Sequence, residues 1–144
     1  MHFDAPVSKE ILQGALARSP FIDFLGLVVL KTDPEREEIH MRLEMRPEFE
    51  RAPGSGQWHG GPMAAVIDTV GDYALMMLIG QALPTINFRV DYLRPAMKTA
   101  LTAIARVRRN GKTVGVVDVD LLNEAGQVVA IGRACYSTLA AAPR

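Results

Sequence analysis

Alternating apolar and polar residues recur along this chain in short runs, the pattern of strands that bury one face. Between residues 39 and 45 every second side chain is apolar, so His40, which falls between two of them, is expected to face solvent. Asn110 and Gly111 separate two such runs and favour a tight hairpin turn. Altogether the pattern predicts six strands, within residues 25–31, 39–45, 86–92, 101–108, 117–121 and 127–138.

The N-terminal residues 1–20 have the spacing of a helix instead. Apolar residues recur four positions apart after Ser8, whose hydroxyl suits the N-cap of a helix, and Pro20 and Gly26 are expected to close this segment. At the other end of the chain, residues 140–144 are expected to form a frayed tail.

A second, longer helix is predicted from Met63 to Gly80, after a loop at residues 46–57 that is rich in proline, glycine and charge. Pro62 suits its first turn and Gly80 its C-terminal cap. Nearly every residue of this helix is apolar, which is typical of a helix buried on all sides.

The order of these elements indicates the fold class. Short hairpin connections make a sheet antiparallel, and its apolar face needs a cover, which the long helix provides. The chain is therefore predicted to be a single α+β domain spanning residues 1–144, in which one curved antiparallel sheet wraps around a long central helix. A length of 144 residues fits one domain.

Composition and charge narrow the function classes. With 49% hydrophobic residues and 16 basic against 16 acidic side chains, the chain is neither disordered nor a basic nucleic-acid binder, and its zero net charge favours self-association. A single cysteine, Cys135, excludes an intrachain disulfide and is interpreted as a structural thiol. The first residues lack the pattern of a signal peptide, and Asp68 and Asp72 make residues 62–80 a poor membrane span. We therefore expect a cytoplasmic, soluble protein with no membrane or nucleic-acid partner.

Asp68 and Asp72 are the first residues that packing does not explain. They lie four apart and share one face of an apolar helix, where an ionised carboxylate is unfavourable unless it is paired or functional. No lysine or arginine lies between Gly60 and Gln81 to neutralise them. Two interpretations stay open: at least one acid is functional, or both are structural and meet a partner from a strand or another subunit.

His59, Gly60 and Gly61 stand at the start of the same helix. Backbone N–H groups at a helix N-terminus carry partial positive charge, and glycine allows a ligand atom to approach them closely. Such a site suits a developing oxyanion, although most double glycines are simply turns. Asp68 lies seven residues after Gly61, nearly two turns away on the same side of the helix, with a side chain that leans back toward this N-terminus.

Three segments in register resemble one protein family. The run from His59 to Asp68, HGGPMAAVID, resembles the His-Gly-Gly motif of the hotdog-fold acyl-CoA thioesterases, of the phenylacetate-pathway and 4-hydroxybenzoyl-CoA type, with an acid nine residues after the histidine. Residues 90–96, VDYLRPA, resemble the strand ending of this family, and residues 126–138 resemble its last hairpin. The similarity covers roughly residues 26–139.

The resemblance implies a hotdog subunit that dimerises so that two active sites form at the interface; we expect a homodimer as the minimum and a homotetramer as the full assembly. Asp68 falls on the family's catalytic carboxylate, which acts as nucleophile or as general base for water. Gly60 falls on the residue whose N–H polarises the thioester carbonyl, and His59 on the histidine that shapes the loop. Thr85 matches a position where some relatives carry Ser or Thr near the water, and in several relatives the acid and the glycine come from different subunits. No cofactor or metal is expected, because no cluster of His, Cys and acidic residues has metal-ligand spacing.

Two positions depart from the family pattern. Relatives commonly have Asn or Gln six residues before the motif histidine, where this chain has Pro53, which offers neither a side-chain donor nor a backbone N–H. Gln57 or Ser55 would substitute if the loop were shifted. Asp72 stands where relatives often have a small or hydroxyl residue, and two acids this close raise the pKa of one of them, which favours general acid–base chemistry over a permanently ionised nucleophile.

The substrate-binding residues are expected around the same helix. Trp58 either covers the thioester or anchors the loop, and Tyr73, Met76 and Met77 are either core residues or acyl-pocket lining. The arginines near the hairpin at residues 110–111 either bind coenzyme A phosphates or are solvated turn charges. The predicted substrate-binding residues are Gly61, Asp72, Trp58, Tyr73 and Arg94, beside the predicted catalytic residues Asp68, Gly60, His59 and Thr85.

Three functions are considered. The preferred one is hydrolysis of an acyl- or aryl-CoA thioester to the free acid and coenzyme A, with Asp68 activating water or attacking the carbonyl and the Gly60 N–H stabilising the oxyanion. The alternative is a non-catalytic acyl-CoA or lipid binding module that uses the same groove, suggested by Pro53. A hydratase on the same fold is third, because the differently spaced Asp/His pair of those relatives is missing from the sequence. The acyl group, and the choice between nucleophile and general base, stay open.

Overall fold

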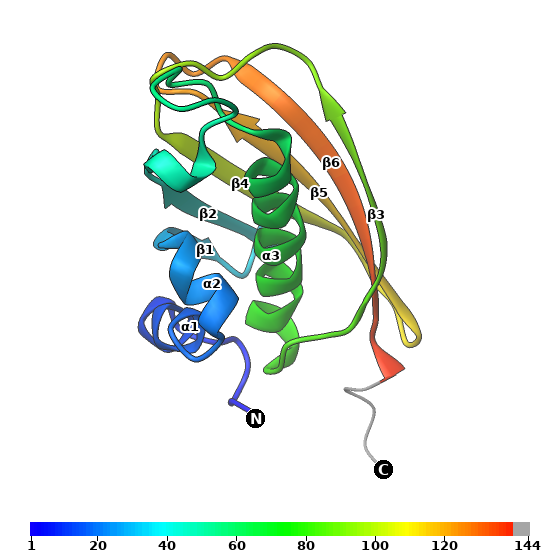
Figure 1. Cartoon of the computed structure of the whole chain (residues 1–144). Coiled ribbons are helices and arrows are strands. Elements are labelled where there is room, and N and C mark those ends of the chain that lie inside the picture. The colour runs from blue at the N-terminus through cyan, green and yellow to red at the C-terminus, as the bar shows by residue number, and fades with distance from the viewer. Residues whose placement is uncertain (140–144) are drawn as a thin grey trace.

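The computed structural model describes residues 1–139 and confirms the predicted α+β architecture, in which a curved six-stranded antiparallel sheet wraps around one long helix (Figure 1). The helices are α1 (Lys9–Leu16), α2 (Pro20–Leu25) and the central α3 (Gly60–Ile79), with a short 3-10 helix at Pro47–Phe49. The strands are β1 (Val28–Asp33), β2 (Glu38–Leu43), β3 (Thr85–Tyr92), β4 (Leu101–Asn110), β5 (Val114–Leu122) and β6 (Val128–Ser137). The predicted tail at residues 140–144 lies outside the described residues.

The strands are arranged in the order β1-β2-β4-β5-β6-β3, and every neighbouring pair is antiparallel. β4, β5 and β6 follow one another through short turns, whereas β3 is reached from the end of α3 and joins the far edge of the sheet beside β6 (Figure 1). The predicted alternation is confirmed on β4 and β5, where Ala103, Ala105, Val119 and Leu121 are buried in the core and the residues between them lie on the outer face.

The outer face of the sheet is polar and carries ion pairs between strands. Arg106 of β4 bonds Glu38 of β2 at 2.8 Å, and Arg133 of β6 bonds Asp118 of β5 at 2.6 Å. His40 lies on this face as predicted, but it is half-buried, with its ring bonded to the Glu38 carboxylate. The functional groups of interest therefore lie on the other side of the sheet, around α3.

The central helix α3 occupies the hollow of the sheet (Figure 1). It begins at Gly60, three residues before the predicted start, because His59 caps it, and it ends at Gly80, whose φ of 93° is the left-handed conformation predicted for this cap. By length and composition α3 resembles a membrane span, but 61% of its most apolar stretch is buried inside the fold. Its apolar character is thus explained by its place in the core.

The N-terminal segment differs from the prediction. Ser8 caps α1 as expected, with its hydroxyl accepting from the Ile11 N–H at 3.3 Å, but Pro20 begins a second helix instead of closing the first. Proline is favoured in the first turn of a helix, and Gly26, in the left-handed conformation, ends α2. β1 consequently begins at Val28, three residues later than predicted. α2 lies beside the C-terminal half of α3, whereas α1 packs against β1 (Figure 1).

The edge strand β3 exposes apolar side chains. Ile86 and Phe88 are 54% and 41% exposed, although their alternation with polar residues predicts a buried face. β3 pairs with β6 on one side and with no described strand on the other. An apolar sheet edge of this kind is a surface that proteins normally cover.

Candidate active site

The start of α3 leaves one backbone donor unpaired. The first four N–H groups of a helix have no partner within it. Here the His59 N–H donates to the Phe49 carbonyl at 2.8 Å, the Gly61 N–H donates to His59 Nδ1 at 3.0 Å, and Pro62 has no N–H. Of these four positions, Gly60 alone has an N–H that donates to no acceptor among the described residues. The sequence HGGP therefore presents a single donor at the positive end of the helix dipole.

Aromatic packing holds the loop that leads into α3. Trp58 is 3% exposed, stacks on Phe49 with ring centroids 5.5 Å apart, and donates from Nε1 to the Thr99 carbonyl at 2.8 Å. Its backbone N–H donates to the Ala96 carbonyl at 2.9 Å, which ties the loop to the segment that follows β3. Of the two roles considered for Trp58, these contacts support the anchor of the loop.

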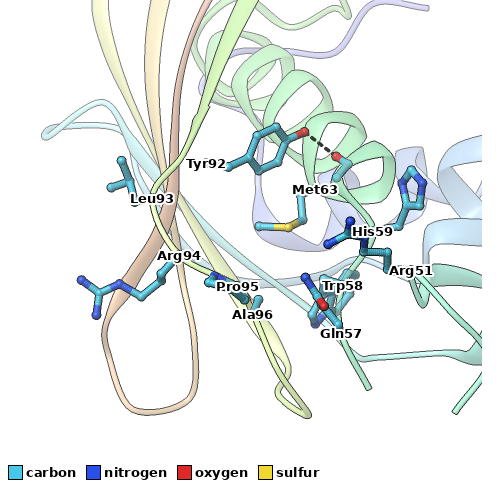
Figure 2. A pocket seen from close by; sticks show the side chains of 11 residues that line it. Arg51, Gln57, Trp58, His59, Met63, Tyr92, Leu93, Arg94, Pro95 and Ala96 are labelled. Atoms are coloured by element: carbon cyan, nitrogen blue, oxygen red, sulfur yellow. Dashed lines mark hydrogen bonds between the residues drawn. The ribbon is translucent and has the colours of Figure 1, made fainter. Parts of the chain in front are cut away.

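A cavity of about 450 Å³ lies beside Gly60 (Figure 2). It is lined by Arg51, Gln57, Trp58, His59, Gly60, Met63 and residues 92–96. Arg94, a predicted substrate-binding residue, belongs to this lining, and its guanidinium points away from His59 (Figure 2). Arg51 and Tyr92 were not predicted as site residues: Arg51 lies in no motif, and Tyr92 was considered only as part of the strand ending at residues 90–96.

The loop places Pro53 outside the lining of the cavity beside Gly60. Pro53 is exposed and lines a separate hollow with neighbouring residues of the loop, away from Gly60. Gln57, considered above as a substitute, does line the cavity beside Gly60. Ser55, the other substitute, uses its hydroxyl to accept from the Gln57 N–H at 3.2 Å. Gln57 is therefore an amide side chain at the cavity beside Gly60, at a different position in the loop from Pro53.

Asp68 lies further along α3, half-buried, and faces the first residue of β3. The Thr85 hydroxyl donates to Asp68 Oδ1 at 2.8 Å, so the structure brings these two predicted catalytic residues together. The Tyr136 hydroxyl donates to the backbone carbonyl of Asp68 at 2.6 Å and fixes the helix at this point. Asp68 Oδ2 accepts no hydrogen bond from residues 1–139, which leaves this oxygen available to a water or a substrate.

Asp72, one turn later, has a different environment. Its Oδ1 accepts from the Leu83 N–H at 2.9 Å. Burial raises the pKa of Asp72 to about 7; the Leu83 hydrogen bond opposes this increase, and the charge of Asp68 adds to it. The prediction that one of the two acids has a raised pKa thus points to Asp72.

Asp72 and Tyr73 line a second cavity, of about 380 Å³, between α3 and the N-terminal segment. This cavity shares no residue with the one beside Gly60. The structure therefore places these two predicted substrate-binding residues apart from His59 and Gly60. Tyr73 and Met76 are 4% and 3% exposed, so both belong mainly to the core.

The separation of Gly60 from Asp68 limits what one chain can do. Eight residues of helix rise about 12 Å, and the backward lean of an aspartate side chain shortens this by only about 2 Å. A carbonyl that accepts from the Gly60 N–H needs its attacking group within about 3 Å of the carbonyl carbon. Asp68 therefore cannot attack a carbonyl that is bound to Gly60 of the same chain.

Metal-ligand clusters and the arginines near the hairpin are the other candidate features of the chain. Within residues 1–139, no group of three His, Cys, Asp or Glu residues is arranged to hold a metal ion. Near the hairpin at residues 110–111, Arg106 bonds Asp120 at 3.3 Å and Arg108 bonds Asp118 at 3.6 Å. These pairs favour the interpretation of the hairpin arginines as solvated surface charges.

Comparison with known proteins identifies one family. Residues 55–130 match the family model described as the Thioesterase superfamily. The chain is 31% identical over 135 residues to the medium/long-chain acyl-CoA thioesterase YigI of Escherichia coli, covering 81% of this chain and 84% of that protein. It is 28% identical over 128 residues to human acyl-coenzyme A thioesterase 13, covering 87% and 89%. The solved structure of the E. coli PaaI protein from the phenylacetic acid degradation operon matches with a TM-score of 0.73 at 25% identity, over 90% of this chain and 95% of that one.

Proposed function

Because this chain belongs to the Thioesterase superfamily and has its hotdog fold, we propose that it hydrolyses an acyl-CoA thioester to the free acid and coenzyme A. One observation carries the proposal: α3 begins with a single unpaired N–H, at Gly60, beside a cavity of about 450 Å³. A half-buried carboxylate with a free oxygen, on Asp68, supplies the second group that thioester hydrolysis needs.

The Gly60 N–H acts as the oxyanion donor. A thioester carbonyl oxygen that accepts from it becomes negative as a nucleophile adds to the carbon, and the positive end of α3 stabilises this charge more in the transition state than in the ground state. Asp68 either takes a proton from the attacking water or attacks the carbon itself to form an anhydride that water then hydrolyses. The thiolate of coenzyme A leaves with the electrons of the C–S bond. Thr85 orients the carboxylate through its bond to Oδ1.

The complete site is formed by two copies of the chain. The distance along α3 separates Gly60 from Asp68 within one chain, so a second copy has to supply one of the two groups. The exposed apolar edge of β3, with Ile86 and Phe88, is the surface on which a second copy would pair. Thr85 begins this strand, so pairing there places Asp68 at the interface. Further pairing of two dimers gives the expected tetramer.

The test is release of free thiol from a panel of short, medium, long and aromatic acyl-CoA substrates. Gly60→Pro removes the proposed donor and keeps the helix start, since proline is tolerated at the first position of a helix. Gly60→Ala is its matched control, because it keeps the N–H and adds the same Cβ, which lies 3.0 Å from the Tyr92 hydroxyl. We expect Gly60→Pro to lower kcat by about 100-fold to 1,000-fold, the usual effect of losing an oxyanion donor, and Gly60→Ala to have a much smaller effect.

Two results would contradict this account. If the folded wild type releases no thiol from any substrate of the panel, the proposed activity is wrong. If the two Gly60 variants lose the same activity, the loss comes from crowding against Tyr92 rather than from the missing N–H.

A non-catalytic acyl-CoA binding module is the second candidate, and Pro53 is the observation that favours it. The position that carries an amide side chain in relatives has none here, and Pro53 lies away from the cavity beside Gly60. Calorimetric titration with the same acyl-CoA panel separates the candidates, since saturable binding without thiol release identifies the binding module.

A further inference from the structure

Two tyrosines attach α3 to two neighbouring strands. The Tyr92 hydroxyl, at the end of β3, donates to the Gly60 carbonyl at 2.6 Å. The Tyr136 hydroxyl, on β6, donates to the Asp68 carbonyl at 2.6 Å. These carbonyls belong to the two residues that supply the oxyanion donor and the acid in the proposed function. Neither phenol takes part in the steps described above.

The two hydrogen bonds have different surroundings. Tyr136 is 0% exposed and lies against Gly71, where a Cβ would sit 2.4 Å from the hydroxyl, so its bond is part of the core. Tyr92 is 52% exposed and lines the cavity beside Gly60 (Figure 2). The Gly60 carbonyl is in the first turn of α3, where the N–H of the next turn and water both satisfy it. Folding therefore does not require the Tyr92 bond.

Tyr92 instead restrains the backbone at the free donor. The Gly60 carbonyl and the Gly61 N–H belong to one peptide group, and both are bonded, the oxygen to Tyr92 and the N–H to His59 Nδ1. Glycine has wide backbone freedom, so fixing this peptide on one side of Gly60 limits the direction of the Gly60 N–H on the other. The phenol also lies close above this residue, with its hydroxyl 3.0 Å and its Cζ 3.1 Å from the place of a Gly60 Cβ.

The tyrosine is suited to be a permanent donor. Burial raises the pKa of Tyr92, so its hydroxyl keeps its proton at neutral pH. A donor of this kind holds the Gly60 carbonyl without adding a charge to the cavity.

We propose that Tyr92 is a positioning residue that aims the Gly60 N–H at the substrate carbonyl. The inference rests on the proposed function, in which this N–H stabilises the oxyanion. Misplacement of a catalytic group by about 1 Å lowers rates by up to about 100-fold. The direction of the Gly60 N–H should therefore have a measurable effect on kcat.

Tyr92→Phe tests the proposal because it removes the hydroxyl and keeps the ring. We expect kcat for thiol release to fall about tenfold, less than for complete loss of the donor, with KM and the melting temperature unchanged. Tyr136→Phe is the matched comparator, since it removes a hydroxyl bonded to α3 at the same distance but in the core, and it is expected to lower the melting temperature. An unchanged kcat in Tyr92→Phe, or a loss of kcat that only follows a lower melting temperature, overturns the proposal.

A second measurement does not depend on turnover. In protein labelled with ¹⁵N-glycine, the amide signals of Gly60 and Gly61 are expected to shift in Tyr92→Phe and to stay in place in Tyr136→Phe. If the wild type releases no thiol, the proposed function fails, while shifted signals still support the orienting contact and unchanged signals overturn it. If the wild type is active and Tyr92→Phe equals it, the proposed function stands and this inference alone fails.

Discussion

Asp68 and Asp72 are identical in type, lie one turn apart on α3, and have opposite surroundings. Asp68 is held by the Thr85 hydroxyl through one oxygen and keeps the other free, at the edge of the sheet where the chain exposes apolar side chains. Asp72 lies deeper, accepts from the Leu83 N–H, and has its pKa raised to about 7 by burial. The difference shows that the surroundings of an acid, rather than its spacing on a helix, decide which chemistry is open to it.

The same contrast separates the two ends of α3. At its start, the helix leaves the Gly60 N–H unpaired beside a cavity. At its end, Gly80 donates to the Met76 carbonyl at 2.8 Å and accepts from the Phe3 N–H at 2.8 Å. The start of α3 therefore has an open donor beside a cavity, whereas its end is bonded to the N-terminal segment.

The largest expected effect tests the contrast between the acids directly. Asp68→Asn should lower kcat for acyl-CoA hydrolysis by at least about 100-fold, because it removes the base or nucleophile. Asp72→Asn, the matched control on the same helix face, should lower kcat by less than about threefold, since an amide oxygen still accepts from Leu83. Steady-state thiol release measures kcat for both variants. Equal losses of kcat would contradict the distinction between Asp68 and Asp72.

A smaller loss of kcat is expected from removing the Thr85 hydroxyl, which donates to Asp68. Thr85→Val keeps the shape of the side chain and removes the bond to Oδ1, so kcat should fall about tenfold, as expected for one hydrogen bond to a charged group. Thr102→Val on the outer face of β4 serves as the control, because it lies on the far side of the sheet from Asp68. A Thr85→Val enzyme with wild-type kcat would show that Asp68 is oriented by something else.

The last effect concerns stability rather than rate and belongs to Asp72. Its carboxyl holds a proton up to about pH 7 in the folded chain but only to about pH 3.8 when unfolded, so the folded state binds more protons between these values. Stability should therefore fall as pH rises from about 4 to about 7, by about 1.4 kcal/mol for each unit of pKa difference at most.

Asp72→Asn removes this titration and should be more stable than the wild type at pH 8, with the advantage lost at pH 4. Urea midpoints at the two pH values provide the measurement. A variant that is less stable than the wild type at pH 8 would mean that the ionised Asp72 carboxylate is favoured in the fold, contrary to its burial.

Periodicity in the sequence was enough for the sheet and the central helix, because both depend on local patterns of burial. The second N-terminal helix was missed because proline ends one helix as readily as it begins another, and Pro20 does the latter. The apolar alternation of β3 predicted a buried face, but Ile86 and Phe88 lie exposed, since β3 is an edge strand and no described element covers these side chains.

The site was predictable in part. The motif and its family resemblance predicted Gly60, Asp68 and Thr85 as site residues. In the structure the Thr85 hydroxyl donates to Asp68. The Gly60 N–H stays free because the Phe49 carbonyl and the His59 ring accept from the neighbouring N–H groups. Only the folded loop brings these two acceptors to the start of α3. Tyr92 belongs to the motif at residues 90–96, but its contact with Gly60 could not be predicted, because the two residues are 32 positions apart in the chain.

In the proposed function Gly60 of one chain works with Asp68 of another, and mixed dimers show whether the two residues share a site across chains. Gly60→Pro and Asp68→Asn chains, carrying different affinity tags, are unfolded and refolded together, and the dimers with both tags are purified. Each such dimer has one site with both changes and one site with neither, so the account predicts about half of the wild-type thiol release from two parents that are nearly inactive. Mixed dimers as inactive as their parents would place Gly60 and Asp68 in a site within one chain and contradict the account.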